Sequence, residues 1–125
     1  MSTLRVGIAS YEEMKAMTLA VARGERRLGK KEARVWFPST ESFAKVLSAG
    51  NRELLGVIAE KAPRSLDELA ELTGRKKSNL SRTLKTMANY GLVRLERGAR
   101  GRIATKVAYE RVELELPLVR GDFAA

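Results

Sequence analysis

One stretch in the second half of the chain changes from a helical to a strand repeat, and this change limits the folds open to it. Leu80, Leu84 and Met87 recur at the i, i+4, i+7 spacing of one helical face. Gly91 follows them in the position that favours a left-handed C-cap. Two short apolar runs around the turn at residues 98–101 then predict a β-hairpin.

A shorter helix is predicted just before this one. Ser65 and Glu68 have the S-x-x-E spacing of a capping box, and Gly74 ends the helical pattern. Ala70 and Gly74 are four residues apart, which lets two helices cross closely at a tight turn. We expect Ser78 to start the second, longer helix. The residues expected to face inward on the first helix are Leu66, Leu69, Ala70 and Leu72.

The charge of the chain is concentrated in the same stretch. Residues 75–106 hold ten Lys or Arg and a single acid, Glu96, so they carry a net +9, and the whole chain is also +9. The rest of the chain is therefore balanced. A local positive field of this kind attracts a polyanion.

The predicted outer face of the longer helix carries side chains suited to a DNA major groove. Arg can bond guanine, Asn can bond adenine, and Ser can donate or accept. Basic residues at a helix start, with free backbone N–H groups, suit phosphates. The hairpin adds further bases. The candidate DNA-binding residues are Arg75, Lys76, Lys77, Ser78, Asn79, Ser81, Arg82, Lys85, Arg97, Arg100 and Arg102.

These residues also carry a family resemblance. Residues 65–97, and above all the run Ser-Asn-Leu-Ser-Arg-Thr-Leu-Lys at 78–85 followed by Gly91-Leu92-Val93, resemble the DNA-binding core of MarR- and ArsR-type regulators. The whole chain is similar to small prokaryotic winged-helix proteins, some of which are antitoxins encoded beside small toxins. The resemblance implies a winged helix whose hairpin lies over phosphates and the adjacent minor groove. The chain lacks the long dimerisation helices of MarR proteins and the Cys and His of metal-sensing ArsR proteins.

The first residues predict a strand, a helix and a second strand. Alternation predicts a strand over residues 4–9, and Ser10 can cap a helix over residues 11–23. A second strand at residues 35–37 is stopped by Pro38. The polar, glycine-containing segment between them predicts a loop.

Two further helices are expected in the middle of the chain. Ser39 or Thr40 can cap the first, and Ala49-Gly50 is expected to break it. Asn51 is expected to cap the second, which ends before Pro63. The residues expected on the buried face of this second helix are Leu54, Leu55, Ile58 and Ala59.

We therefore expect an α+β protein with three parts. Residues 1–38 form a strand–helix–strand appendage, residues 39–118 a winged helix-turn-helix domain with a C-terminal strand, and residues 119–125 a tail. The strands at residues 4–9 and 112–118 each have one apolar face that needs a partner, although Pro117 weakens the second. This pattern favours a homodimer through both strands, with two recognition helices about 34 Å apart on a near-palindromic site.

Composition narrows the classes of function. The chain has no Cys and no His, which removes disulfides, thiolate zinc sites and Ser–His–Asp catalysis. We therefore expect no enzyme, no catalytic residue, no metal and no cofactor. No apolar run approaches the roughly 20 residues of a membrane span, and no secretory signal is recognisable, so we expect a cytoplasmic protein with no membrane partner.

Several conspicuous residues have simpler structural interpretations. The pair Trp36-Phe37 is expected in the core or at a dimer contact rather than stacked on bases. Residues 23–34, with six bases and two acids, are interpreted as an exposed loop. Three methionines at helical positions are expected as core filler, namely Met14, Met17 and Met87.

The function expected from the sequence is sequence-specific binding of double-stranded DNA by a transcription regulator, a repressor. One alternative is an antitoxin that represses its own operon and holds a small toxin on the appendage. Another is a winged-helix adaptor that binds proteins, against which the basic hairpin argues. RNA binding is less favoured, because few aromatic residues are placed to stack bases. The sequence leaves the operator and any effector ligand open.

Overall fold

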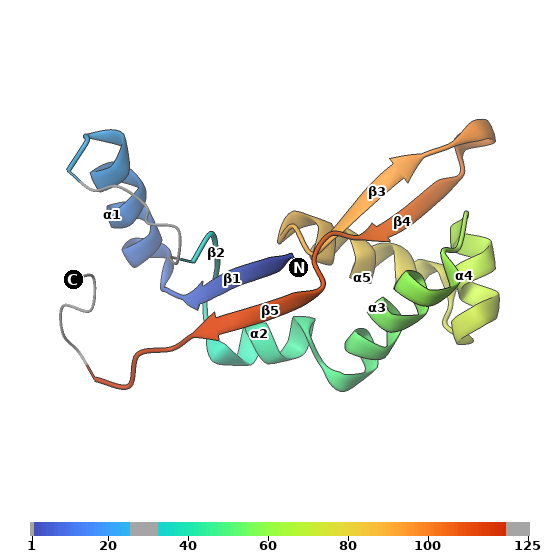
Figure 1. The fold of residues 1–125 in the computed structure, drawn as a ribbon, viewed down its shortest axis with the longest axis horizontal. Coiled ribbons are helices and arrows are strands. Elements are labelled where there is room, and N and C mark those ends of the chain that lie inside the picture. The colour runs from blue at the N-terminus through green and yellow to red at the C-terminus, as the bar shows by residue number, and fades with distance from the viewer. Residues whose placement is uncertain (1, 26–32, 120–125) are drawn as a thin grey trace.

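A computed structural model describes residues 2–25 and 33–119, and these residues form an α+β protein with five α-helices and two small sheets (Figure 1). The α+β class expected from the sequence is confirmed at this level. Most of the expected tail and much of the expected loop at residues 23–34 lie outside the described residues. In chain order the elements are β1 (Thr3–Ile8), α1 (Tyr11–Ala22), β2 (Val35–Phe37), α2 (Thr40–Val46), α3 (Ala49–Lys61), α4 (Leu66–Thr73), α5 (Lys77–Asn89), β3 (Val93–Arg97), the short turn η1 (Ala99–Gly101), β4 (Ile103–Val107) and β5 (Arg111–Glu115).

The larger sheet joins the two ends of the chain. Its strand order is β2-β1-β5, and both pairings are parallel. The register sets Val6 beside Val35 on one side and beside Leu114 on the other. The sequence did not predict that the first and last strands pair with each other, and the homodimer expected through them stays a prediction. β5 ends at Glu115, two residues before Pro117, which has no N–H to donate to a strand partner.

The two faces of this sheet differ. Leu4, Val6 and Phe37 are almost completely buried and belong to the main core. Phe37 stacks on Tyr90 of the loop after α5, with ring centroids 4.1 Å apart. On the opposite face, the half-buried Trp36 ring lies directly over Gly7. The expectation of a core position is thus confirmed for Phe37, and the neighbouring Trp36 covers the back of the sheet.

Serine side chains start most of the helices. Ser10 caps α1 in a full capping box with Glu13, and Ser39 caps α2. α3 is capped by Ser48, whose Oγ accepts from the backbone N–H of Asn51 at 3.2 Å. The expectation that Asn51 is the cap, after a break at Ala49-Gly50, is wrong. Its side-chain amide instead donates to the carbonyl of Val46 at 3.0 Å and holds α2 against α3.

The helices α4, α5 and α1 also differ in detail from what the sequence predicts. Ser65 caps α4, but the Glu68 carboxylate accepts from Arg64 N–H, so the capping box is incomplete. Leu72 is 43% exposed rather than inward, because the short α4 turns a narrow stripe around Leu69 into the core. α5 begins at Lys77, one residue earlier than expected. Of the three methionines, Met87 is fully buried, whereas the two on α1 are half-buried.

The core is centred on α5. Leu80, Leu84 and Met87 are each at most 1% exposed, as the i, i+4, i+7 pattern predicts. α5 packs against α2, α4 and β3. The helix ends at Asn89 with Tyr90 as its C-cap, and Gly91 follows with a φ of +78°, which allows Leu92 N–H to donate to the Met87 carbonyl at 2.9 Å. Among the described helices none is long and apolar enough to cross a membrane.

The close approach at Gly7 gives a test of the sheet. A Cβ added at Gly7 would lie 2.3 Å from the Trp36 ring, so Gly7→Ala should lower the free energy of unfolding by about 1–3 kcal/mol. Gly56→Ala is the matched control, because nothing lies within 4 Å of that position in α3. It should raise stability by about 0.5–1 kcal/mol. Denaturant titrations that show equal effects for the two variants would contradict this packing.

Candidate nucleic-acid interface

The turn between α4 and α5 fixes how the second helix is presented. Gly74 ends α4 in the left-handed region with a φ of +74°, and its N–H donates to the Ala70 carbonyl at 2.8 Å. Arg75 N–H donates to the Thr73 hydroxyl at 3.2 Å. α5 then starts after Lys76 without a side-chain cap. Its first backbone N–H groups are therefore available to an anion.

One candidate residue, Arg75, has a structural role within the chain. Its Nη1 donates to Asn51 Oδ1 at 3.1 Å, and its Nη2 donates to the Gly50 carbonyl at 2.9 Å. The guanidinium therefore ties the turn before α5 to the first turn of α3. The sequence could not reveal this contact, because 24 residues separate Arg75 from Asn51.

The remaining candidates on α5 are exposed and project away from the buried stripe. Lys77 forms an ion pair with Asp67 in the first turn of α4, with Nζ and Oδ1 3.1 Å apart. Within the described residues, Lys76, Arg82 and Lys85 make no ion pair. Thr86 also lies on this exposed face, four residues after Arg82, and sequence reasoning missed it. The exposed candidates on and before α5 are Lys76, Lys77, Ser78, Asn79, Ser81, Arg82 and Lys85.

The smaller sheet is the antiparallel hairpin of β3 and β4. Its root is fixed in the core, because Val93 and Thr105 are each 2% exposed. The register places Arg94 directly opposite Lys106, so two bases share one face of the hairpin. Sequence reasoning put both on the hairpin but did not include them among the binding residues. Each of these bases follows a buried residue, Val93 or Thr105, and this alternation is the sequence signal that could have placed both bases on the exposed face.

The tip of the hairpin projects three exposed arginines. Gly98 N–H donates to the Arg102 carbonyl at 2.7 Å and closes the turn. Arg100 lies between these residues with a φ of +60°, a left-handed conformation that is uncommon for a residue with a Cβ. Arg97, Arg100 and Arg102 are all exposed and, within the described residues, form no ion pair. The backbone therefore holds three unpaired cations around one turn.

The fold brings the two groups of cations to one end of the molecule. α4, α5 and the hairpin lie at this end, whereas α1 and the end of β5 lie at the other (Figure 1). We call the exposed surface formed by residues 76–86 and 94–106 the basic end. Its excess positive charge comes from two separate elements that a protein–polyanion contact could use together.

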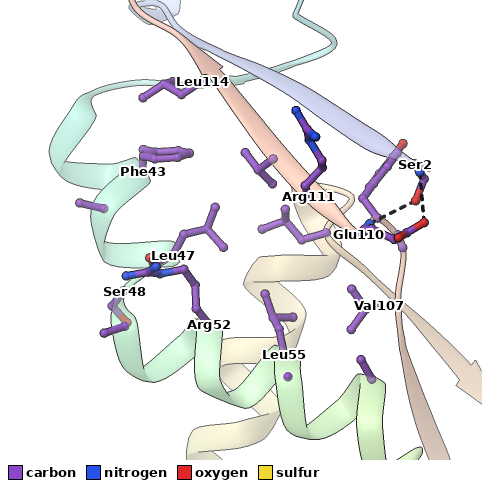
Figure 2. A pocket seen from close by; sticks show the side chains of 18 residues that line it. Ser2, Phe43, Leu47, Ser48, Arg52, Leu55, Val107, Glu110, Arg111 and Leu114 are labelled. Carbon is purple, nitrogen blue, oxygen red and sulfur yellow. Dashed lines mark hydrogen bonds between the residues drawn. The ribbon is translucent and has the colours of Figure 1, made fainter.

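A second surface feature was not predicted. A groove of about 1130 Å³ lies between α2, α3 and β5 (Figure 2). Phe43, Leu47 and Leu55 form its apolar wall on the helical side, and Leu114 lies on the strand side. At one end Glu110 N–H donates to the Ser2 hydroxyl at 3.1 Å. The groove combines residues far apart in the sequence, so no local pattern revealed it.

Comparison with known proteins places this arrangement in a family. The model of a family described as HVO_A0114 matches residues 46–114, which is more than half of the chain, and the chain belongs to that family. The match begins at the last residue of α2 and ends inside β5, so it includes α3, α4, α5 and the hairpin. No curated protein and no solved structure matches the chain.

The left-handed residue at the hairpin tip gives a second test. Arg100→Gly removes the Cβ that disfavours a φ of +60°, whereas Arg100→Ala keeps it. The glycine variant should therefore be about 0.5–1 kcal/mol more stable than the alanine variant in denaturant titrations. Equal stability of the two variants would mean that the tip does not hold this conformation in solution.

Proposed function

We propose that the protein binds double-stranded DNA sequence-specifically and acts as a transcription regulator, a repressor. In this proposal α3, α4, α5 and the hairpin form a winged helix. α5 enters the major groove, and the β3–β4 hairpin, the wing, contacts phosphates. The observation that carries the proposal is the basic end, because residues 75–106 hold the whole net charge of +9 and lie on α5 and the hairpin at one end of the molecule.

The chemistry of α5 supports reading of bases rather than phosphate contact alone. Asn79 and Arg82 are exposed on its first two turns, opposite the buried Leu80 and Leu84. Asn can bond adenine bidentately, and Arg can bond guanine bidentately. Because the buried residues fix the rotation of the helix, both side chains are presented to the same side as the unpaired Lys85.

The start of α5 and the wing support phosphate binding. α5 has no side-chain cap, and Lys76 stands at its N-cap position. The partial positive charge of a helix N-terminus adds to these cations. The exposed arginines of the wing tip lie on a separate element, so the wing could contact phosphates apart from those at the start of α5.

A protein-binding adaptor is the alternative from another class, and salt dependence separates it from the proposal. DNA binding driven by phosphate contacts weakens steeply as salt rises, because condensed counterions are released on binding. Filter binding of a labelled duplex should therefore fall between about 50 and 200 mM salt by orders of magnitude. No retention of duplex at low salt would favour the adaptor.

The proposal predicts direct readout by α5. Asn79→Ala or Arg82→Ala should cost about 1–3 kcal/mol on the selected site and much less on random duplex. Lys15→Ala on α1 is the control for Arg82→Ala, since it also removes one exposed positive charge from a helix. Equal losses on both kinds of DNA would mean that these side chains contact only phosphates.

The proposal also predicts the role of the wing. Removal of one cation that neutralises a phosphate should flatten the plot of log K against log salt by about 0.9, so the combined change of Arg97, Arg100 and Arg102 to Ala should flatten it by up to about 2.7. A variant with Lys15, Arg23 and Lys45 changed to Ala loses the same formal charge away from the wing. An unchanged slope in the wing variant would exclude the wing from the interface.

A further inference from the structure

β5 is an edge strand with an outer edge that no described strand occupies. One edge of β5 pairs with β1, and the sheet order ends there. The other edge presents backbone N–H and C=O groups that can pair with another strand. The groove lies beside this edge, since β5 lines it whereas no residue of β1 does (Figure 2).

Exposed apolar residues also concentrate at the sheet end of the molecule. The described residues include nine large hydrophobic side chains that are exposed, and seven of them lie on α1 or from Leu114 to Val119. This sheet end is opposite the basic end (Figure 1). The seven are Tyr11, Leu19, Val21, Leu114, Leu116, Leu118 and Val119. Exposed apolar residues concentrated in one region indicate an interaction surface.

We propose that β5 pairs antiparallel with β5 of a second copy of the chain, about a two-fold axis at Glu113. The two larger sheets would then form one six-stranded sheet in the order β2-β1-β5-β5-β1-β2. Such a contact is self-complementary, as a two-fold interface requires. The proposal does not rest on DNA binding, although a two-fold dimer would present two copies of α5 to one duplex.

The pattern of β5 selects this register. In an antiparallel pair, side chains that lie directly opposite each other are on the same face of the sheet. The apolar faces of the two β5 strands therefore form one continuous face only if the two-fold axis lies at a residue position. An axis between two residues would set apolar residues opposite charged ones. With the axis at Glu113, all five residues of β5 face residues of β5. Val112 then lies opposite Leu114, and Arg111 lies opposite Glu115, each twice.

Charge also favours this register over one with the axis at Leu114. Glu115 makes no ion pair within the described residues, so the pairing with Arg111 would give it one. The two Glu113 carboxylates would meet at the axis, but each is already bound by Arg5, at 2.9 Å, and by Arg111 of its own chain. An axis at Leu114 would place Glu113 opposite Glu115, and like charges directly opposite destabilise a strand pair.

The pairing would also cover the groove. Val112 and Leu114 of β5 both line the groove, together with the apolar wall of Phe43, Leu47 and Leu55. A second β5 beside the first would continue this apolar row across the open side. The same contact would therefore pair the backbone groups at the outer edge of β5 and cover the groove.

The absence of cysteine makes a sharp test possible. Glu113→Cys in the full chain places one thiol in each copy directly across the axis, at a Cβ separation near that of a disulfide. Light scattering should give a dimer for the wild-type chain at micromolar concentration. Mild oxidation of Glu113→Cys should give a covalent dimer much faster than oxidation of Val112→Cys, Leu114→Cys or the distant Lys15→Cys.

A monomeric wild-type chain would overturn the proposal, and so would faster cross-linking at residue 112, 114 or 15 than at residue 113.

Charge reversal gives an independent measurement. Arg111→Glu or Glu115→Arg should each weaken the homodimer about tenfold or more, because each creates two like-charge contacts. An equimolar mixture should form heterodimers with restored affinity, provided circular dichroism shows both variants folded. A mixture that stays as weak as its components would contradict the pairing.

These outcomes are separable from those of the proposed function. A dimer that retains no duplex at low salt would leave the β5 pairing intact and reject DNA binding. A monomer that retains duplex would reject the pairing and leave DNA binding intact.

Discussion

The buried stripe of α5 is the contact on which the other elements depend. Leu80, Leu84 and Met87 are inaccessible to solvent because α2, α4 and β3 all pack against this helix. The stripe also fixes the rotation of α5 about its own axis, so the polar side chains between these residues face outward. The same three residues therefore determine the core and the orientation of the candidate interface. A change that rotated this helix would move every cation on it.

The chain separates its charged and apolar surfaces by pairing its two ends. β1 and β5 lie side by side although more than 100 residues separate them, and this pairing sets the larger sheet at one end of the molecule. α4, α5 and the hairpin lie at the opposite end, and the excess charge lies on α5 and the hairpin. Such an arrangement leaves the sheet end available for a protein contact and the basic end available for a polyanion.

Local sequence patterns predicted most helices and strands. The features that they did not predict depend mainly on contacts between residues far apart in the sequence. The helical repeat of α5, the glycine turns and the hairpin were predicted because each depends on neighbouring residues. The β1–β5 pairing, the groove and the contact of Arg75 with Asn51 join residues far apart in sequence, so no periodicity marks them. The sequence did not predict Ser48 as the cap of α3, because Gly50 suggested a break between two helices. The first turn of a helix tolerates glycine, so α3 begins at Ala49 and includes Gly50. Exposed candidates such as Asn79 and Arg82 were placed correctly on the outer face because the buried stripe was correct.

Selection of binding sites from a pool of random DNA duplexes tests the central claim most directly. The intact protein is incubated with the pool at a salt concentration near physiological, and the retained duplexes are sequenced after several rounds. If the outer face of α5 reads base edges, a short motif should become enriched over the starting pool. Retention without any enriched motif, or enrichment equal to that from a variant with both Asn79 and Arg82 changed to Ala, would contradict the account.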